Sequence, residues 1–357
     1  MKIKFLLLTF IISSFTSFTS CSNRPKISRK PVAKITFQSR TNRYVFGDSV
    51  FISIQIKNKN GELKNSELYI DNKLVKTSDQ EEFSYSIPKM TVLGRHPVRV
   101  YSVKTDSVSG DTYTSFDVVS DILPENYGYE VVKTYPHNKD HFTQGLEIHN
   151  NKFYESTGLK GHSAIYQFDL KTGKVLKSFK MEDKYFGEGI TIMNNKIYQL
   201  TYKASKGFVY DLNTFARLDT FTYETHEGWG LAHNDKYLIK TDSSEFLTFL
   251  NPKTFEVVKK LQVWDNKGPI KDLNELEYHN GVLYANVWTT NLVVKIDPTT
   301  GKVLGKINFE GLHSVLFNPE KPIDVLNGIA IDPTNGKMYI TGKLWPQLYE
   351  VKLIRKD

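Results

Sequence analysis

The segment FGEGITIMNNKIYQLTY, residues 186–202, decides the fold because the chain repeats its pattern four more times. It starts with polar or glycine residues, continues as an alternating apolar strand, turns at an asparagine pair and returns in a strand rich in Tyr, Ile and Leu. The other copies are FTQGLEIHNNKFYESTG (142–158), EGWGLAHNDKYLIKTD (227–242), LNELEYHNGVLYANVW (273–288) and LNGIAIDPTNGKMYITG (326–342). Equivalent places are occupied by Gly145, Gly189, Gly230, Glu275 and Gly328, at separations of 44, 41, 45 and 53 residues.

Each of the first four copies is followed by a third strand and a further turn, as in IYQFDLKTGKVLKSF (165–179). Four-stranded repeats of about 40 residues are typical of a β-propeller, so the repeats predict an all-β, five-bladed propeller over residues 125–357. The strand YEVVKTYP (129–136) precedes the first copy, and the last copy lacks an outermost strand after QLYEVKLI (347–354). Pairing these two strands would close the ring and remove an open edge. An array of β-sandwiches is the alternative.

Residues 32–123 predict a separate domain. Short alternating stretches such as SVFISIQIKN (49–58) are divided by Gly, Asn and Asp turns. Their spacing favours an immunoglobulin-like β-sandwich. No group of side chains in this region suggests chemistry, so we expect a spacer or docking module.

The N-terminus reads as an export signal. Lys2 and Lys4 precede the apolar run FLLLTFII, and small residues follow up to residue 20. Cys21, the only cysteine, comes directly after this segment and cannot form an internal disulfide. We expect a lipoprotein-type signal peptide (1–20), a lipidated Cys21, a polar tether (21–31) and an exported protein anchored to the membrane of a bacterial cell envelope. Plain secretion with an unpaired thiol is the alternative, since Phe18 stands where such cleavage sites usually carry leucine.

The net charge of +8 does not indicate a nucleic-acid partner. The lysines are spread one or two per turn, as in DPTTGKVLGK (297–306), and no basic cluster with interleaved aromatic residues occurs.

The heads of the repeats carry the candidate site, because the innermost strands of a propeller converge on one mouth of its channel. The heads and the ends of the second strands differ in their large polar or aromatic residues, unlike purely structural repeats. These residues are Phe142, Gln144, Phe186, Glu188, Tyr202, Trp229, Asn274, Glu275, Trp288, Asn327 and Lys343. Gly187 and Gly189 would let the backbone turn tightly and leave Glu188 access to a cavity.

Structural roles compete with these functional ones. Trp229 and Trp288 could plug the channel, Glu188 could cap a turn or pair with a lysine, and Lys343 could be a surface charge. Gln144 and Asn274 could satisfy backbone groups of the inner strands.

Two enzyme classes lack candidates in the sequence. The histidines do not group with metal-ligand spacing, since His137 and His141 stand four apart in a loop and His226 and His233 are isolated, so no metal site is predicted. No GxSxG motif marks a nucleophilic serine.

The motifs HFTQGL, FGEGIT, EGWGL, LNELEY, ANVW and TGKLWP resemble those of the plant-type and bacterial glutaminyl-peptide cyclotransferases, in the same order from about residue 129 to 353. The resemblance implies a five-bladed propeller that converts the N-terminal glutamine of peptides or proteins to pyroglutamate and releases ammonia. It requires no cofactor, and the family is unrelated to the animal zinc enzymes of the same activity. Some members hold a structural calcium ion in the central channel through backbone carbonyls.

The resemblance also implies roles for individual residues. Glu188 is the acid/base group, with Gln144 and Phe142 near it, and Asn274 and Lys343 are polar partners of the substrate. The pocket wall is formed by Phe186, Trp229 and Trp288. At Tyr202 relatives often have a tryptophan, which leaves the depth and polarity of that wall open.

Two other functions compete with this one. A non-catalytic propeller could bind a peptide terminus or a sugar in the same cavity, but it would not need Glu, Asn and Lys converging on one pocket. A lactonase-like hydrolase would need more carboxylates around a metal than the heads provide.

Overall fold

The computed structural model describes residues 27–313 and 323–356, and Cys21 with the signal segment lies outside them. Every regular element in the described residues is a β-strand. Those residues include no long apolar helix of the kind that could cross a bilayer. The all-β class predicted from the sequence is therefore confirmed.

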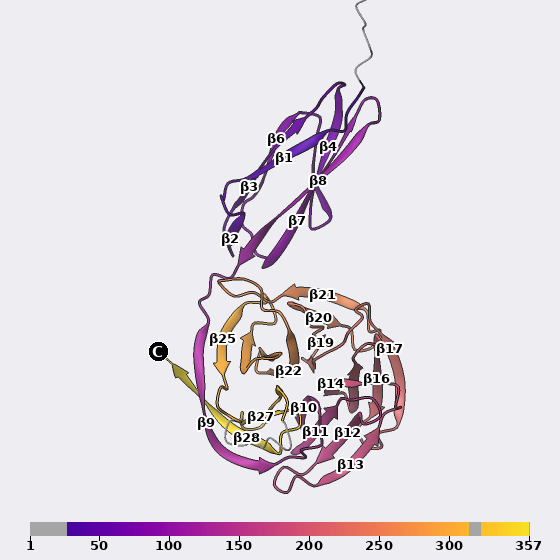
Figure 1. Cartoon of the computed structure of the whole chain (residues 1–357), viewed down its shortest axis with the longest axis vertical. Helices are drawn as coiled ribbons and strands as arrows, with labels where there is room; N and C mark the ends of the chain where they lie inside the picture. The colour runs from indigo at the N-terminus through magenta and orange to yellow at the C-terminus, as the bar shows by residue number, and fades with distance from the viewer. Residues whose placement is uncertain (1–26, 314–322, 357) are drawn as a thin grey trace, which may run out of the picture.

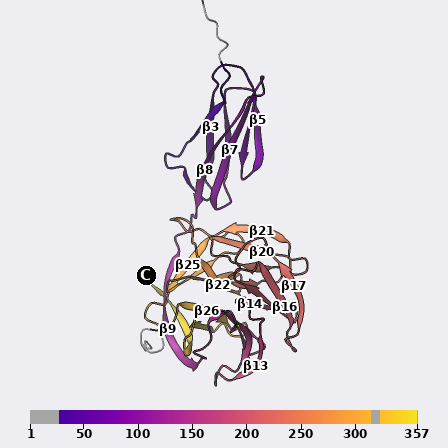
Figure 2. The ribbon, with the colours of Figure 1, turned by 45° about the vertical axis from the view of Figure 1, so that its right-hand side comes forward.

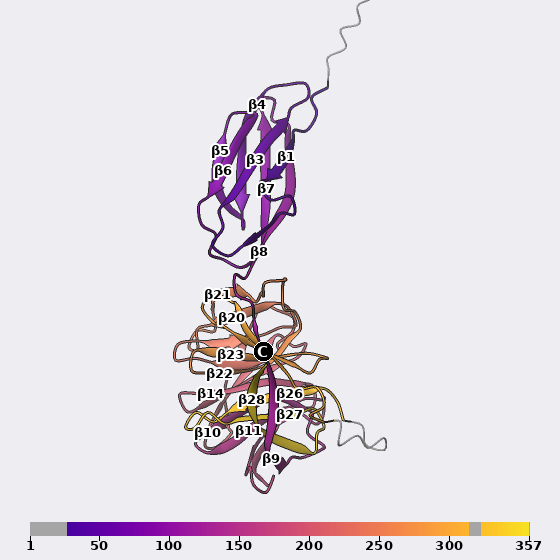
Figure 3. The same ribbon diagram turned by 90° about the vertical axis from the view of Figure 1, so that its left-hand side faces the viewer.

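The N-terminal strands form two sheets that face each other (Figures 1 and 3). The smaller sheet has the order β1 (Val32–Phe37), β3 (Val50–Lys57), β6 (Glu82–Ile87). The larger has the order β2 (Arg43–Val45), β8 (Ser109–Val119), β7 (Gly94–Lys104), β4 (Leu63–Ile70), β5 (Lys73–Ser78). Burial alternates strictly along β3, so one face of this strand packs in the core between the sheets.

The strands after residue 124 form sheets around a common centre (Figures 1 and 2). Three consecutive four-stranded sheets come first: β10 (Thr143–His149) to β13 (Val175–Lys180), β14 (Gly187–Met193) to β17 (Arg217–Thr222), and β18 (Leu231–His233) to β21 (Val257–Gln262). Their middle strands are β11 (Lys152–Thr157), β12 (Ala164–Phe168), β15 (Lys196–Thr201), β16 (Lys206–Asp211), β19 (Leu238–Lys240) and β20 (Phe246–Leu250). Each later strand of a sheet pairs antiparallel with the one before it, as the repeats predict.

The last two repeats share one eight-stranded sheet, which the sequence did not predict. Its order is β22 (Leu273–His279), β23 (Val282–Val287), β24 (Leu292–Ile296), β25 (Val303–Asn308), β9 (Glu125–Pro136), β28 (Gln347–Lys356), β27 (Met338–Gly342), β26 (Leu326–Ile331). The predicted pairing of the strand at 129–136 with the end of the last repeat is observed, because β9 runs antiparallel to β28. The start of β9 also pairs parallel with β25, which joins the fourth repeat to the fifth.

The ring closes through its innermost strands. The first strand of each repeat contacts the first strand of the next, from β10 through β14, β18 and β22 to β26, and β26 contacts β10. The residue that heads each of these strands therefore lies near the same end of the central channel.

Trp264 joins the two parts of the chain. It follows β21 and is buried among core residues of the N-terminal sheets. Next to it, Ser120 N donates to Asp265 O (3.1 Å), and Lys302 Nζ lies 2.7 Å from Asp121 Oδ1. The N-terminal sheets therefore contact the loop after β21 and the turn before β25, as the ribbon also shows (Figure 1).

Candidate active site

β-Bulges aim the head residues inward in four of the five repeats. In β14 and β15, Gly187 pairs with Thr201 and Ile190 with Gln199, so Glu188 and Gly189 together oppose a single residue. Comparable shifts in register occur at Gln144, at Asn274 and at Asn327. A bulge turns a side chain away from the regular alternation of its strand, and bulges are frequent next to active sites.

The glycines beside Glu188 are required by close backbone packing, and not by the tight turn that we expected. Neither Gly187 nor Gly189 has a positive φ. A Cβ on Gly187 would lie 2.6 Å from the carbonyl oxygen of Thr157, and one on Gly189 would lie 2.4 Å from Leu231 N. The glycines therefore let the inner strands approach one another closely while Glu188 points into the cavity.

One cavity of about 210 Å³ brings together nine of the eleven predicted site residues of the repeat region. A cavity of this volume has room for about one amino-acid side chain. Asp324, which lies just before β26, also lines it and was not predicted, because no repeat pattern marks the loop that carries it. The complete lining is Phe142, Gln144, Phe186, Glu188, Tyr202, Trp229, Asn274, Trp288, Asp324 and Lys343.

Aromatic rings form the wall. Trp229 and Trp288 meet edge to face with ring centroids 5.4 Å apart. The ring of Phe186 lies between those of Phe142 and Tyr202, at 6.1 Å and 5.6 Å. Trp229 is held by its indole N–H, which donates to Glu227 Oε2 at 3.0 Å, whereas Trp288 is 40% exposed and forms the rim. The tryptophans therefore line the cavity and leave it open.

Glu188 lines this cavity and is only 4% exposed. Gln144 Nε2 donates to Glu188 Oε1 at 3.1 Å, and Asn327 Nδ2 donates to Gln144 Oε1 at 3.1 Å. Burial raises the pKa of Glu188 well above its ordinary value of 4.5, while the charge of Lys343 opposes this shift. A carboxyl with a raised pKa is a candidate for both accepting and returning a proton.

Lys343 follows β27 and is 5% exposed, so the alternative of a surface charge is wrong. Its ammonium lies 4.9 Å from the centroid of the Phe142 ring. Burial lowers the pKa of Lys343, and the charges of Glu188 and Asp324 oppose that shift. The cavity thus holds one buried cation and one buried carboxyl.

Asn274 offers an unused acceptor. Its Oδ1 atom is buried and has no hydrogen-bond partner among the described residues, although a buried polar atom is normally paired. Its backbone oxygen accepts from Thr241 Oγ1 at 2.8 Å, which fixes the residue in place. A ligand N–H would complete the hydrogen bonding of this side chain.

Glu275 and Asn327, the other polar heads, do not line the cavity. Glu275 reaches across the channel, where Leu146 N donates to Oε1 (3.2 Å) and Ile329 N to Oε2 (2.9 Å). Asn327 supports Gln144. Both residues therefore stabilise the ring of inner strands.

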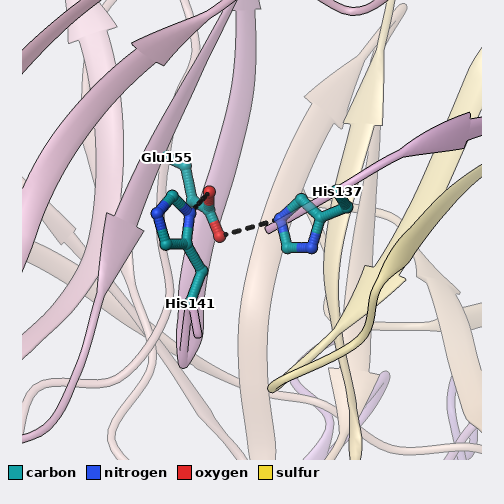
Figure 4. A group of neighbouring side chains, drawn as sticks. All are labelled: His137, His141 and Glu155. Carbon is teal, nitrogen blue, oxygen red and sulfur yellow. Dashed lines mark hydrogen bonds and ion pairs between the residues drawn. The ribbon is translucent and has the colours of Figure 1, made fainter. Parts of the chain in front are cut away.

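His137, His141 and Glu155 form a buried cluster that we did not expect, because the two histidines were assigned to a loop without a partner (Figure 4). Glu155 lies on β11, so only the pairing of β10 with β11 brings it to the histidines. Their potential ligand atoms lie within 4.8 Å of one another, close enough to be considered for a metal ion. The cluster is not part of the cavity lining.

Comparisons with known proteins agree on one family. The family model described as glutamine cyclotransferase matches residues 107–353. A glutaminyl-peptide cyclotransferase of Arabidopsis thaliana is 41% identical over 226 residues, which cover 63% of this chain and 71% of that protein. The crystal structure of Myxococcus xanthus glutaminyl cyclase superposes with a TM-score of 0.61 at 36% identity, covering 66% of this chain and all of that one. The chain belongs to the glutamine cyclotransferase family.

Proposed function

We propose that this chain cyclises the N-terminal glutamine of peptides or proteins to pyroglutamate and releases ammonia. The observation that carries the proposal is the convergence of Glu188, Asn274 and Lys343 in one small aromatic cavity. Family membership and the names of the two relatives support the same activity. A cavity of this size suits the folded-back side chain of one residue and would favour the reactive conformer by orientation.

Glu188 acts as the acid/base group in this proposal. The substrate's neutral α-amine attacks its own γ-carboxamide carbon, and a new N–C bond forms. Glu188 takes the proton that the amine loses, and returns it to the carboxamide nitrogen as the C–N bond breaks and ammonia leaves. Because burial raises the pKa of Glu188, the same group can perform both transfers near neutral pH.

Lys343 and Asn274 bind the substrate's polar atoms. Negative charge develops on the carbonyl oxygen during attack, and the Lys343 ammonium and the Asn274 amide N–H can donate to it. The unpaired Oδ1 of Asn274 accepts an N–H of the substrate. Gln144 has both amide atoms engaged, with Glu188 and Asn327, so its role is to orient the Glu188 carboxyl.

We infer that the repeat region is a five-bladed propeller, in which the eight-stranded sheet counts as two blades joined through β9. The N-terminal sheets are assigned as an immunoglobulin-like sandwich. The described chain begins at the end of this sandwich remote from the ring (Figure 1), which suits a spacer that holds the propeller away from a lipid anchor at Cys21. Replacing Cys21 with Ser should move the protein from the membrane to the soluble fraction of cells.

A structural calcium ion fits the chemistry of the channel. Glu147 and Glu277 line a second cavity of about 450 Å³ around the other end of the inner strands. Their carboxylates accept from Ile192 N (2.9 Å) and Ile331 N (3.2 Å), and they supply oxygen atoms next to the inner strands. Oxygen ligands suit Ca²⁺, and a bound ion would neutralise buried carboxylates without taking part in the reaction.

The test of the proposed activity is ammonia release from a peptide that starts with glutamine. Mass spectrometry should show the loss of one ammonia, and the same peptide with an acetylated N-terminus should not react, because its nitrogen cannot attack. A folded protein that binds the peptide and releases no ammonia would favour the binding propeller instead.

A further inference from the structure

The buried carboxylate of Glu155 accepts three hydrogen bonds from one short segment. His137 Nε2 donates to Oε1 at 3.1 Å and His141 Nδ1 to Oε2 at 2.6 Å (Figure 4). Thr143 Oγ1 donates to Oε1 at 2.7 Å. The ring of His141 also stacks on Tyr166, with centroids 4.1 Å apart. Glu155 has no exposed surface, so its charge is compensated only by these groups.

The acceptors around His137 define its protonation state. Its Nδ1 lies 2.7 Å from the backbone oxygen of Trp345, and its Nε2 faces the Glu155 carboxylate. A carbonyl oxygen and a carboxylate can only accept, so both ring nitrogens must carry protons and the ring is an imidazolium. Burial alone would lower the pKa of His137, but Glu155 outweighs it and the pKa is raised. In this state the cluster is an ion pair, and a metal ion could bind only by displacing a ring proton.

This segment holds the turn that carries Lys343. His137 N donates to Pro346 O at 3.0 Å, and Leu344 N donates to His141 O at 2.8 Å. Together with the bond to Trp345 O, these contacts fix residues 344–346 directly after Lys343. Leu344 has a φ of +62°, a conformation that a bulky side chain rarely adopts unless its surroundings impose it.

The opposite side of the turn is tied to the cavity. Lys343 N donates to Val325 O at 3.0 Å, Asp324 N donates to Lys343 O at 2.9 Å, and the Trp345 indole N–H donates to Asp324 O at 2.8 Å. A shift of the turn would therefore displace both Lys343 and Asp324, two residues of the cavity lining.

We propose that His137, as an imidazolium paired with Glu155, is a positioning residue that sets the place of Lys343 through the backbone of Trp345. This inference rests on the proposed cyclase activity. The hydrogen bonds of the His137 ring go to Trp345 and Glu155, neither of which lines the cavity, so His137 acts through the turn and is not itself a catalytic residue.

A double-mutant cycle of His137→Gln and Lys343→Met tests the proposal. The Gln amide can still reach Glu155 but leaves Trp345 O without its donor, so we expect kcat to fall by about 100-fold with a smaller change in KM. In the Lys343→Met background the same substitution should lower kcat by no more than about twofold, because the group that it positions is absent. Equal losses in both backgrounds would mean a general structural role and overturn the proposal.

Two further variants sharpen the cycle. His137→Asn keeps a donor at the position of Nδ1 and should retain more activity than His137→Gln. His233→Gln is the control. His233 ends β18, does not line the aromatic cavity and forms a hydrogen bond with Thr191, so its replacement should leave kcat unchanged.

A measurement on the wild-type protein does not depend on activity. Nitrogen NMR of ¹⁵N-histidine-labelled protein should show both ring nitrogens of His137 protonated at pH 7, and Glu155→Gln should abolish this state. A neutral ring, or stoichiometric binding of added Zn²⁺ that His141→Ala abolishes, would refute the ion pair. If wild-type protein released no ammonia, the proposed function would fail while the protonation state could still be decided.

Discussion

Replacing Glu188 with Gln should strongly lower turnover and at the same time stabilise the fold. Gln has nearly the shape of Glu, and its side-chain oxygen can still accept from Gln144 Nε2, so the packing around the cavity is preserved. It cannot take a proton from the substrate amine. General acid–base catalysis typically contributes about 10²- to 10⁴-fold, so kcat should fall by that factor, or about 2.7–5.5 kcal/mol in the barrier.

The stability gain follows from the raised pKa of Glu188. The native state disfavours the ionised carboxyl relative to the unfolded chain, in which the pKa is near 4.5. This penalty is absent at low pH, grows as the pH rises above 4.5 and is full above the native pKa. Gln carries no charge and avoids this penalty, so at pH 8 the Gln variant should have the higher melting temperature.

Ammonia release and thermal unfolding, measured on the same samples, test both halves of this prediction. Glu277→Gln is the matched control, because it neutralises another buried carboxyl outside the aromatic cavity and should keep kcat. A Glu188→Gln variant with nearly wild-type kcat would remove Glu188 from the mechanism. Lost activity with a lowered melting temperature would show that the variant fails through misfolding, and would refute the stability argument.

Three other outcomes follow from the structure. Trp229→Ala should lower kcat/KM by about 10- to 100-fold, mainly through KM, because it opens the wall of the cavity; peptide kinetics with Trp288→Ala as the rim control would check this. A fragment of residues 125–357 should keep kcat but melt at a lower temperature, since it exposes Trp264; unchanged melting would mean that the joint adds no stability. In chelator the melting temperature should fall from pH 5 to pH 8. Burial raises the pKa of Glu147 to about 8, so over that range the native state keeps a proton that the unfolded chain releases; Ca²⁺ at pH 8 should restore the melting temperature, and the same value with and without Ca²⁺ would exclude the channel ion.

The cavity lining can be predicted from the sequence because equivalent positions in successive repeats lie at equivalent places around the ring. Once Gln144, Glu188, Trp229 and Asn274 are known to head equivalent strands, ring closure alone brings them to one mouth. Tyr202, Trp288 and Lys343 follow from the same reasoning, as each comes directly after a second strand. For these residues, the position within the repeat is enough to predict that they line the cavity.

Other features depend on contacts that a repeat pattern does not encode. Asp324 lies in a loop with no equivalent in the other copies, and Glu155 is an inner residue of β11 that the alternation alone would assign to ordinary packing. Its role appears only when the segment at 137–143 folds against it and the turn at 342–346 joins them. The merging of two repeats through β9 likewise depends on where the linker from the first domain enters the ring.

The neighbouring residues Asn274 and Glu275 show how one strand can serve both catalysis and stability. Regular alternation would turn successive side chains to opposite faces of a sheet, but the bulge sets both residues against one partner and lets each point along a different direction of the channel. Asn274 enters the cavity, while Glu275 accepts two backbone N–H groups from β10 and β26. In the other repeats a glycine at this place lets the strands approach; here a carboxylate links them instead. A deletion in this bulge would therefore remove a site residue and a link across the channel together, so the geometry of the site and the closure of the ring depend on the same irregularity.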